Sequence, residues 1–76
     1  MTPAELTVRE REVAAWVAFG ATDKQIAAQL TISRQRVHII VSAIAYKIGA
    51  DATRNERVQV ALWWHAHQPV DAGNSA

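Results

Sequence analysis

The sequence predicts an all-α fold of four helices. Four segments carry the start and stop signals of helices, and no segment shows the apolar–polar alternation of a strand. Only a tight turn, residues 30–33, separates the second segment from the third. A short helix, a tight turn and a longer helix with one apolar face are the layout of a helix-turn-helix. We therefore predict a four-helix helix-turn-helix domain over residues 1–67.

The first helix is expected to follow Thr7. Thr7 and Glu10 have the spacing of a capping box, in which each side chain binds the other residue's backbone amide. Val13 and Val17 lie one turn apart and are expected to face the core. Gly20 is placed to end the helix, because glycine adopts the left-handed conformation most readily.

The second and third helices are expected over residues 22–30 and about 34–48. Thr22 and Gln25 predict a second capping box, and Ser33 is the expected N-cap of the third helix. Gly49 is expected to end the third helix. Its inward residues recur at helical spacing and form the clearest apolar stripe in the chain: Val37, Ile40, Val41, Ile44 and Ile48.

The fourth helix is expected to begin at Thr53, with Glu56 completing a capping box, and to reach about His67. Three of its apolar residues are expected to face the core: Val58, Ala61 and Leu62. The remaining segment, residues 68–76, is small and polar, so it is expected to form a flexible tail.

The composition excludes several classes of protein. Half of the 76 residues are apolar and a fifth are charged, the balance of a folded soluble domain. The absence of cysteine excludes disulfides, thiolate zinc sites and thiol nucleophiles. No apolar run reaches the roughly 18–20 residues of a membrane span, and the N-terminus lacks the layout of a signal peptide. We therefore expect a cytoplasmic protein without membrane contact.

No pattern in the sequence indicates catalysis. His65 and His67 are two residues apart on a helix, so their side chains do not converge on one metal ion. There is no glycine-rich phosphate loop, and Ser33 is assigned to helix capping instead of nucleophilic attack. We therefore expect no enzymatic activity, no catalytic residue, no metal site, no cofactor and no small-molecule ligand.

Basic residues concentrate in the middle of the chain, although its net charge is only +1. Residues 31–57 hold five Lys and Arg against two Asp and Glu, whereas residues 1–30 hold three against four. Such a surplus is equally typical of a solvated helix face. The pattern alone leaves two interpretations open: a pair of helices whose second member enters the DNA major groove, and an ordinary helical hairpin.

Several blocks of the sequence resemble the LuxR/GerE-type tetrahelical helix-turn-helix domain. Residues 6–13, LTVREREV, are similar to that family's LTxREREV; residues 20–27, GATDKQIA, to GxTNKEIA; and residues 30–33, LTIS, to LxIS. Five further residues fall where the family shows V…I..KLG: Val37, Ile44, Lys47, Ile48 and Gly49. The resemblance covers roughly residues 6–64. It implies a transcription regulator that binds DNA as a dimer, with the fourth helix at the contact between the two subunits.

The resemblance also implies a DNA-backbone contact by Lys24. Arg36 stands where the family usually has threonine, and His38 where it usually has lysine. Ile40 replaces a frequent histidine, so one anchoring contact is lost, because isoleucine cannot donate to a phosphate. The loop over residues 50–57 is longer than usual. These departures concern the DNA-facing residues and leave the predicted fold unchanged.

The outward residues of the third helix are the candidates for DNA contact. Arginine suits guanine, glutamine suits adenine, and an exposed isoleucine packs on a thymine methyl group. The candidates for contact with base edges are Arg34, Gln35, His38 and Ile39. Phosphate contacts fix the register of the protein on DNA without reading sequence, and we expect them from Lys24, Arg36, Lys47 and Arg54.

The fourth helix carries the candidate dimer surface. A core of this size cannot easily enclose Trp63 and Trp64 together with Trp16, because each aromatic side chain has about 150–250 Å² to bury. Exposed aromatic residues on one helix usually mark a contact surface. We therefore expect a two-fold homodimer through three residues: Val60, Trp63 and Trp64.

The predicted function is that of a sequence-specific transcription regulator that binds double-stranded DNA as a dimer, with residues 34–48 in the major groove. The alternative is a protein-interaction module of the same fold that binds another regulator or a polymerase subunit without reading DNA. The isoleucine-rich third helix and the near-neutral net charge favour the alternative. Lys24 and the arginines at positions 34 and 36 oppose it.

Overall fold

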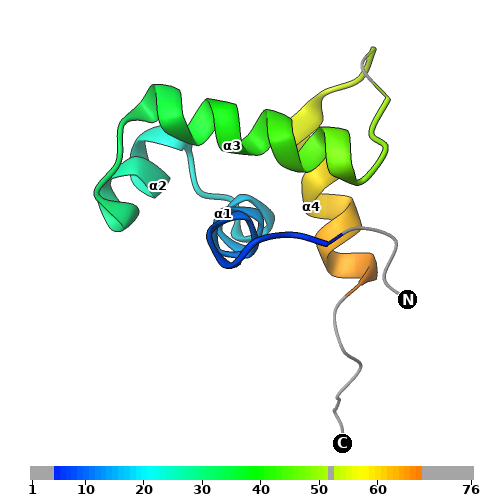
Figure 1. The fold of residues 1–76 in the computed structure, drawn as a ribbon, viewed down its shortest axis with the longest axis horizontal. Coiled ribbons are helices and arrows are strands. Elements are labelled where there is room, and N and C mark those ends of the chain that lie inside the picture. Colours follow the sequence, from blue (N-terminus) through cyan, green and yellow to red (C-terminus); the bar gives the residue numbers. More distant parts are fainter. Residues whose placement is uncertain (1–4, 52, 68–76) are drawn as a thin grey trace, which may run out of the picture.

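The computed structural model describes residues 5–51 and 53–67, which form four helices (Figure 1). These are α1 (Val8–Phe19), α2 (Asp23–Leu30), α3 (Arg34–Lys47) and α4 (Glu56–Ala66). The described residues contain no strand, so the all-α prediction is confirmed. None of these helices is long and apolar enough to cross a membrane. The predicted tail, residues 68–76, lies outside the described residues.

The predicted caps of α1 and α2 are both present. Thr7 Oγ1 accepts a hydrogen bond from the Glu10 amide at 3.1 Å, and Glu10 Oε1 accepts one from the Thr7 amide at 2.8 Å. Thr22 and Gln25 repeat this arrangement at the same two distances. Gly20 follows α1 with φ of 100°, a left-handed conformation that glycine adopts without steric conflict. These local signals therefore define where the first two helices begin and where α1 ends.

The turn between α2 and α3 is as tight as predicted. Thr31 adopts the left-handed conformation, with φ of 58°, and its amide donates to the Ala27 carbonyl. Ser33 then caps α3, because its Oγ accepts a hydrogen bond from the Arg36 amide at 3.0 Å. The turn sets the angle between the two helices that make up the helix-turn-helix.

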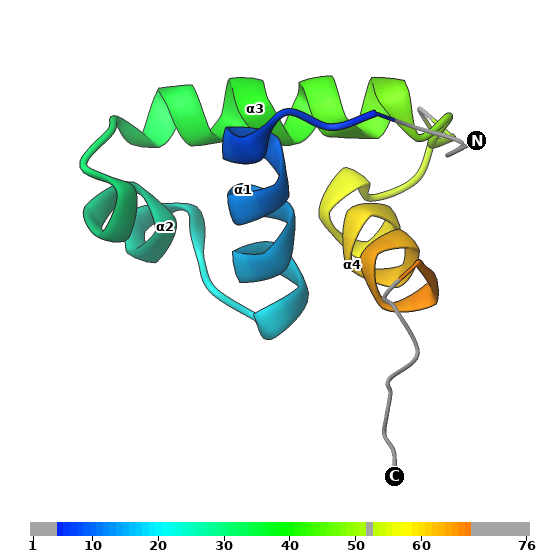
Figure 2. The same cartoon turned by 60° about the horizontal axis from the view of Figure 1, so that its bottom comes forward.

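The core lies beneath α3. Figure 2 shows α3 extending along one side of the molecule, with α2, α1 and α4 next to one another under it. The predicted apolar stripe of α3 is confirmed: four of its residues are buried, and Ile48 packs against them from the end of the helix. The buried apolar residues are Val13, Ala14, Val17, Ala21, Ile26, Ala27, Val37, Ile40, Val41, Ile44, Ala45 and Val60.

Helix α4 begins later than the sequence suggested. Its N-cap is Asn55, whose Oδ1 accepts a hydrogen bond from the Val58 amide at 3.1 Å. Thr53 instead donates from its amide and its hydroxyl to Asp51 Oδ1, at 2.9 and 2.7 Å. The predicted capping box of Thr53 and Glu56 is therefore wrong, because Asp51 holds the threonine in the preceding turn.

The predicted inner face of α4 is wrong at two of its three residues, since only Ala61 packs against the core as expected. Val60 is fully buried and Trp64 packs against the core, whereas Val58 and Leu62 expose 54% and 65% of their surface. Positions 60, 63 and 64 form a stripe at helical spacing that competes with the stripe over positions 58, 61 and 62. Trp64, which packs against the core beside Val60, has more apolar area to bury than Val58 or Leu62, so burying it contributes more free energy.

The connection between α3 and α4 is fastened to α4 by one side chain. Gln59 Oε1 accepts a hydrogen bond from the Asp51 amide, and Gln59 Nε2 donates to the Asp51 carbonyl, both at 2.7 Å. Gly49, with φ of 74°, turns the chain away from the end of α3. The two hydrogen bonds therefore hold the backbone of Asp51 against α4.

An ion pair joins the first turn of α1 to the last turn of α3. Lys47 Nζ donates to Glu10 Oε1 at 2.8 Å, and the Glu10 side chain exposes only 12% of its surface. Burial of the carboxylate works to raise the pKa of Glu10, but hydrogen bonds from Lys47 and Thr7 outweigh burial and hold this pKa below its ordinary value. The folded protein thus favours the charged carboxylate.

We expect Lys47→Met to lower the free energy of unfolding by about 1 kcal/mol near pH 7. This value lies between the small contribution of an exposed pair and the loss of about 3–5 kcal/mol for a fully buried one, because Lys47 is partly exposed to water. Urea unfolding of the variant and the wild type measures the difference.

The effect depends on pH in a defined direction. Because folding lowers the pKa of Glu10, the contribution of the pair is present above the ordinary pKa of 4.5 and is lost as the pH falls through the folded-state value. The difference in unfolding free energy between wild type and Lys47→Met should therefore be smaller at a pH well below 4.5 than near pH 7. An equal difference at both pH values would contradict this assignment.

Candidate nucleic-acid interface

All four residues predicted to contact bases lie on the surface of α3. Arg34, Gln35 and His38 are exposed, and Ile39 exposes 50% of its surface. Tyr46, to which the sequence assigned no role, is 88% exposed and continues the outward line of Gln35 and Ile39 at helical spacing. The exposure that base contact requires is therefore present at each predicted position.

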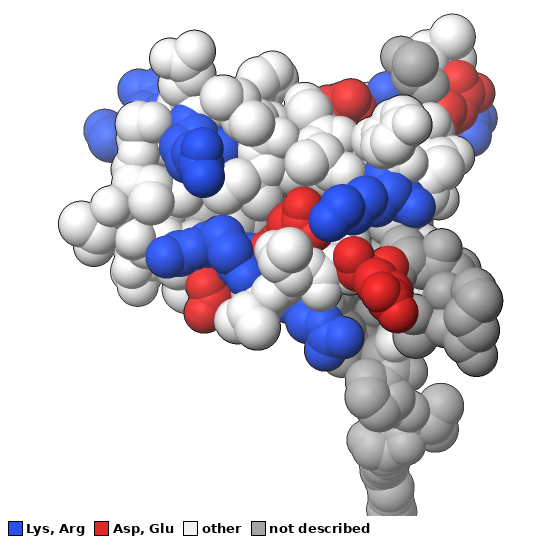
Figure 3. Space-filling view, viewed as in Figure 1, with Lys and Arg blue, Asp and Glu red and all other residues white. Residues whose placement is uncertain are grey.

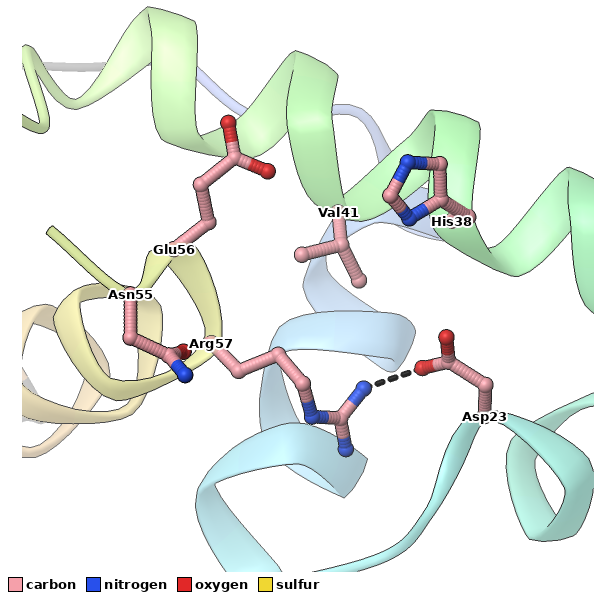
Figure 4. A pocket seen from close by; sticks show the side chains of 6 residues that line it. All are labelled: Asp23, His38, Val41, Asn55, Glu56 and Arg57. Carbon is pink, nitrogen blue, oxygen red and sulfur yellow. Dashed lines mark hydrogen bonds and ion pairs between the residues drawn. The ribbon is translucent and has the colours of Figure 1, made fainter. Parts of the chain in front are cut away.

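Two of these residues lie toward α2 and α4. Arg34 borders a hollow that is also lined by Lys24 and Arg57. His38 borders a neighbouring hollow, which Figure 4 shows between α3 and the first turn of α4. Six residues line this second hollow: Asp23, His38, Val41, Asn55, Glu56 and Arg57. The flank of α3 that carries Arg34 and His38 is therefore polar and hollowed.

Three cations form a basic group in the first turns of α2 and α3: Lys24, Arg34 and Arg36. All three are exposed, and within the described residues none of them makes an ion pair. The N-terminal end of a helix carries partial positive charge from its unpaired amides, which adds to that of the side chains. In Figure 3, basic side chains without acidic ones among them lie at the upper left, over α2 and the start of α3, whereas the acidic side chains on this face adjoin other basic ones. This end of the molecule therefore carries an excess of unpaired positive charge among the described residues.

The other two predicted phosphate ligands lie elsewhere. Lys47 is in the last turn of α3, and Glu10 holds its ammonium group. The structure thus gives Lys47 a structural partner in place of the predicted phosphate. Arg54 is exposed in the connection before α4, where its amide donates to the Asp51 carbonyl at 3.0 Å. Its side chain has no ion pair within residues 5–51 and 53–67.

Arg57 makes a contact between α4 and α2 that the sequence did not predict. Its guanidinium group donates to the Asp23 carboxylate, as Figure 4 shows, and also to the Ala21 carbonyl. Asp23 and Arg57 are 34 residues apart in the chain, so no local spacing could reveal the pair. Both residues stand in the first turn of their helices, and this placement is the only signal that the sequence contained.

A second polar contact fastens the first turn of α4 to the middle of α3. Ser42 Oγ donates to Glu56 Oε1 at 3.1 Å. Ser42 therefore faces α4 and is only partly exposed. Together, Glu56 and Arg57 hold the start of α4 against both helices of the helix-turn-helix.

The outer face of α4 exposes an apolar pair one turn apart, Val58 and Leu62. The prediction that Val60 belongs to the dimer surface is wrong, because Val60 has no exposed surface. Trp63 and Trp64 are both half-buried, and the ring of Trp63 stacks on His67 at 4.5 Å between centroids. Because α4 buries Val60 and exposes Val58 and Leu62, the candidate contact surface is formed by Val58 and Leu62.

The histidines near the end of α4 bind backbone groups separately. His65 Nε2 lies 3.3 Å from the Ala18 carbonyl oxygen, and His67 Nδ1 lies 2.9 Å from the Trp63 carbonyl oxygen. Within the described part of the chain, no three residues among His, Cys, Asp and Glu are grouped so that they could hold a metal ion.

Comparison with known proteins gives the family of the chain. No curated protein matches it in sequence. Residues 4–63 match the family model GerE, described as bacterial regulatory proteins of the luxR family. The matched segment contains α1 to α3, the basic group and most of α4. The chain therefore belongs to the luxR family of bacterial regulatory proteins, and its fold is the four-helix, LuxR-type helix-turn-helix DNA-binding domain of a transcription regulator.

Proposed function

We propose that the domain binds double-stranded DNA in a sequence-specific manner, with α3 in the major groove. The observation that carries this proposal is the unpaired basic group beside the exposed residues of α3. In a helix-turn-helix, the N-terminal part of the second helix contacts base edges. Arg34, Gln35, His38 and Ile39 occupy that part of α3, and their side chains are exposed.

The exposed residues divide between two kinds of contact. Base edges are assigned to the four residues just named, with Gln35 suited to adenine and Ile39 to a thymine methyl group. Phosphates are assigned to Lys24, Arg36 and Arg54, which are exposed cations without an ion pair among the described residues. Lys47 is left out of this assignment because Glu10 binds its ammonium group.

The domain is further proposed to act as a two-fold dimer through α4. Val58 and Leu62 are an apolar pair, and each exposes more than half of its surface to solvent. A second copy of the domain would bury both side chains. Two-fold symmetry is the commonest way in which identical chains associate. Such a dimer presents two copies of α3 to two half-sites of one DNA molecule.

The salt dependence of binding tests the phosphate assignments. If three cations per subunit each neutralise one phosphate, the logarithm of the binding constant of the dimer falls with the logarithm of salt at a slope of about −5. Fluorescence anisotropy with random duplex DNA measures this slope. Lys24→Gln should make the slope about 2 less steep and weaken binding to all sequences alike.

Arg9→Gln is the matched control for Lys24→Gln. Arg9 pairs with Glu12 on α1, at 3.5 Å, so its replacement removes the same charge away from the basic group. We expect the control to leave the salt slope nearly unchanged. Binding that does not respond to salt, or an equal effect of the two variants, would refute the phosphate assignments.

The role of Ile39 is tested on the DNA. Replacing thymine with uracil removes one methyl group from the major groove and changes nothing else in base pairing. At the thymine that Ile39 contacts, affinity should fall about fourfold, because a buried methyl or methylene group contributes about 0.8 kcal/mol. Ile39→Ala should bind the two DNA molecules equally at that position. A preference for thymine that survives in Ile39→Ala would exclude this contact.

The dimer is tested by Leu62→Arg. A charge at the centre of the contact should make the protein monomeric in sedimentation equilibrium and reduce the salt slope to about −3, the value for three phosphates. Val8→Arg is the control, because Val8 is 77% exposed on α1 and outside the proposed contact. Both variants should keep the wild-type stability to within about 0.5 kcal/mol. A wild-type protein that is already monomeric at tens of micromolar would overturn the proposed dimer.

One observation favours the alternative function of a protein-interaction module. Phe19 is 84% exposed on α1 and meets Trp16 edge to face, with 6.3 Å between ring centroids. These two aromatic residues and Ala15 line an apolar hollow away from α3, which suits contact with another protein. The absence of any binding to random duplex DNA at low salt would favour this function over DNA binding.

A further inference from the structure

We propose that Asp23 limits the affinity of the domain for DNA by holding Arg57 away from the phosphate backbone. This inference rests on the DNA binding proposed above. Asp23 is the first residue of α2 and directly precedes Lys24, a member of the basic group. The acidic side chain thus lies next to a cation that is assigned to phosphate.

The ion pair lies between the two hollows beside α3. Asp23 and Arg57 both border the hollow that contains Lys24 and Arg34, and both border the hollow that contains His38 (Figure 4). Arg57 is therefore a further cation beside the basic group. Its charge is cancelled by Asp23, whereas no acidic side chain pairs with the basic group within the described residues.

The pair is accessible enough to exchange partners. The side chains of Arg57 and Asp23 expose 35% and 34% of their surface, so neither is enclosed by protein. A guanidinium group has five N–H donors, and in Arg57 hydrogen bonds to protein run from Nη1 to Asp23 and from Nη2 to the Ala21 carbonyl. The hydrogen bond to Ala21 does not depend on Asp23, so α4 keeps one link to the start of α2 when the carboxylate is neutralised.

Asp23 opposes DNA binding in two ways. Its carboxylate repels a phosphate that approaches Lys24, and it competes with phosphate for the guanidinium of Arg57. A phosphate contact carries no sequence information, so the restraint acts on the affinity for all sequences. Lower affinity for random DNA leaves a larger share of the binding free energy to the base contacts of Gln35 and Ile39.

Asp23→Asn is the variant that tests this role. Asparagine keeps nearly the shape of aspartate but removes the charge, and Thr22 remains the N-cap of α2. One additional phosphate contact per subunit should make the salt slope of a dimer steeper by about 2. The gain in affinity for random duplex DNA should then shrink about tenfold between roughly 50 and 200 mM salt.

Glu56→Gln is the matched control. Glu56 borders the same hollow as Asp23, but its side chain accepts from the Ser42 hydroxyl, so its neutralisation removes one negative charge without freeing a cation. We expect a smaller gain in affinity from Glu56→Gln than from Asp23→Asn. Most of the excess should disappear when Arg57→Gln is combined with Asp23→Asn, because the control already removes the repulsion of phosphate by a nearby carboxylate.

The possible outcomes separate this inference from the proposed function. If the wild type binds DNA with the expected salt dependence but Asp23→Asn binds no better than Glu56→Gln, the ion pair is only a structural link and the restraint is refuted. If the wild type shows no salt-dependent binding, both proposals fail. Should Asp23→Asn not fold, as judged by circular dichroism, Asp23→Ser replaces it, because serine is small and uncharged and Thr22 still caps the helix.

Discussion

The apolar stripe of α3 holds this domain together, and its position decides which residues are left for a ligand. Val37, Val41 and Ile44 are almost fully buried against the other three helices. Because a helix turns once every 3.6 residues, burying this stripe places Gln35 and Ile39 on the opposite, exposed side. A chain of this size buries only about 60% of the surface of its unfolded form, so it cannot lose the stripe and remain folded.

The first three helices could be predicted because their signals are local. Thr7 and Glu10 form their hydrogen bonds within one helical turn. The sequence of α3 contains one apolar stripe, and that stripe is the buried one. Helix α4 carries two candidate stripes, and the space left by α1 and α3 decides which of them is buried. Composition within one helix does not describe that space, so Val60 and Leu62 were assigned to the wrong sides.

Exposure in the candidate site could also be predicted, but the partners of its charged residues could not. The sequence does not distinguish Lys47 from Lys24. In the structure, Lys47 forms an ion pair with Glu10, whereas no acidic side chain within the described residues pairs with Lys24. Both Glu10–Lys47 and Asp23–Arg57 join residues far apart in the chain. Long-range pairs of this kind follow from the packing of the helices, which local spacing does not reveal.

These ion pairs explain how a chain with a net charge of +1 can suit a polyanion. Pairing cancels Arg9, Lys47 and Arg57 within the fold, so they add little to the field outside it. The cations of the basic group keep their full effect, since they are exposed and stand where helix ends add partial positive charge. The distribution of paired and unpaired charges, more than their total, therefore decides where an anion binds.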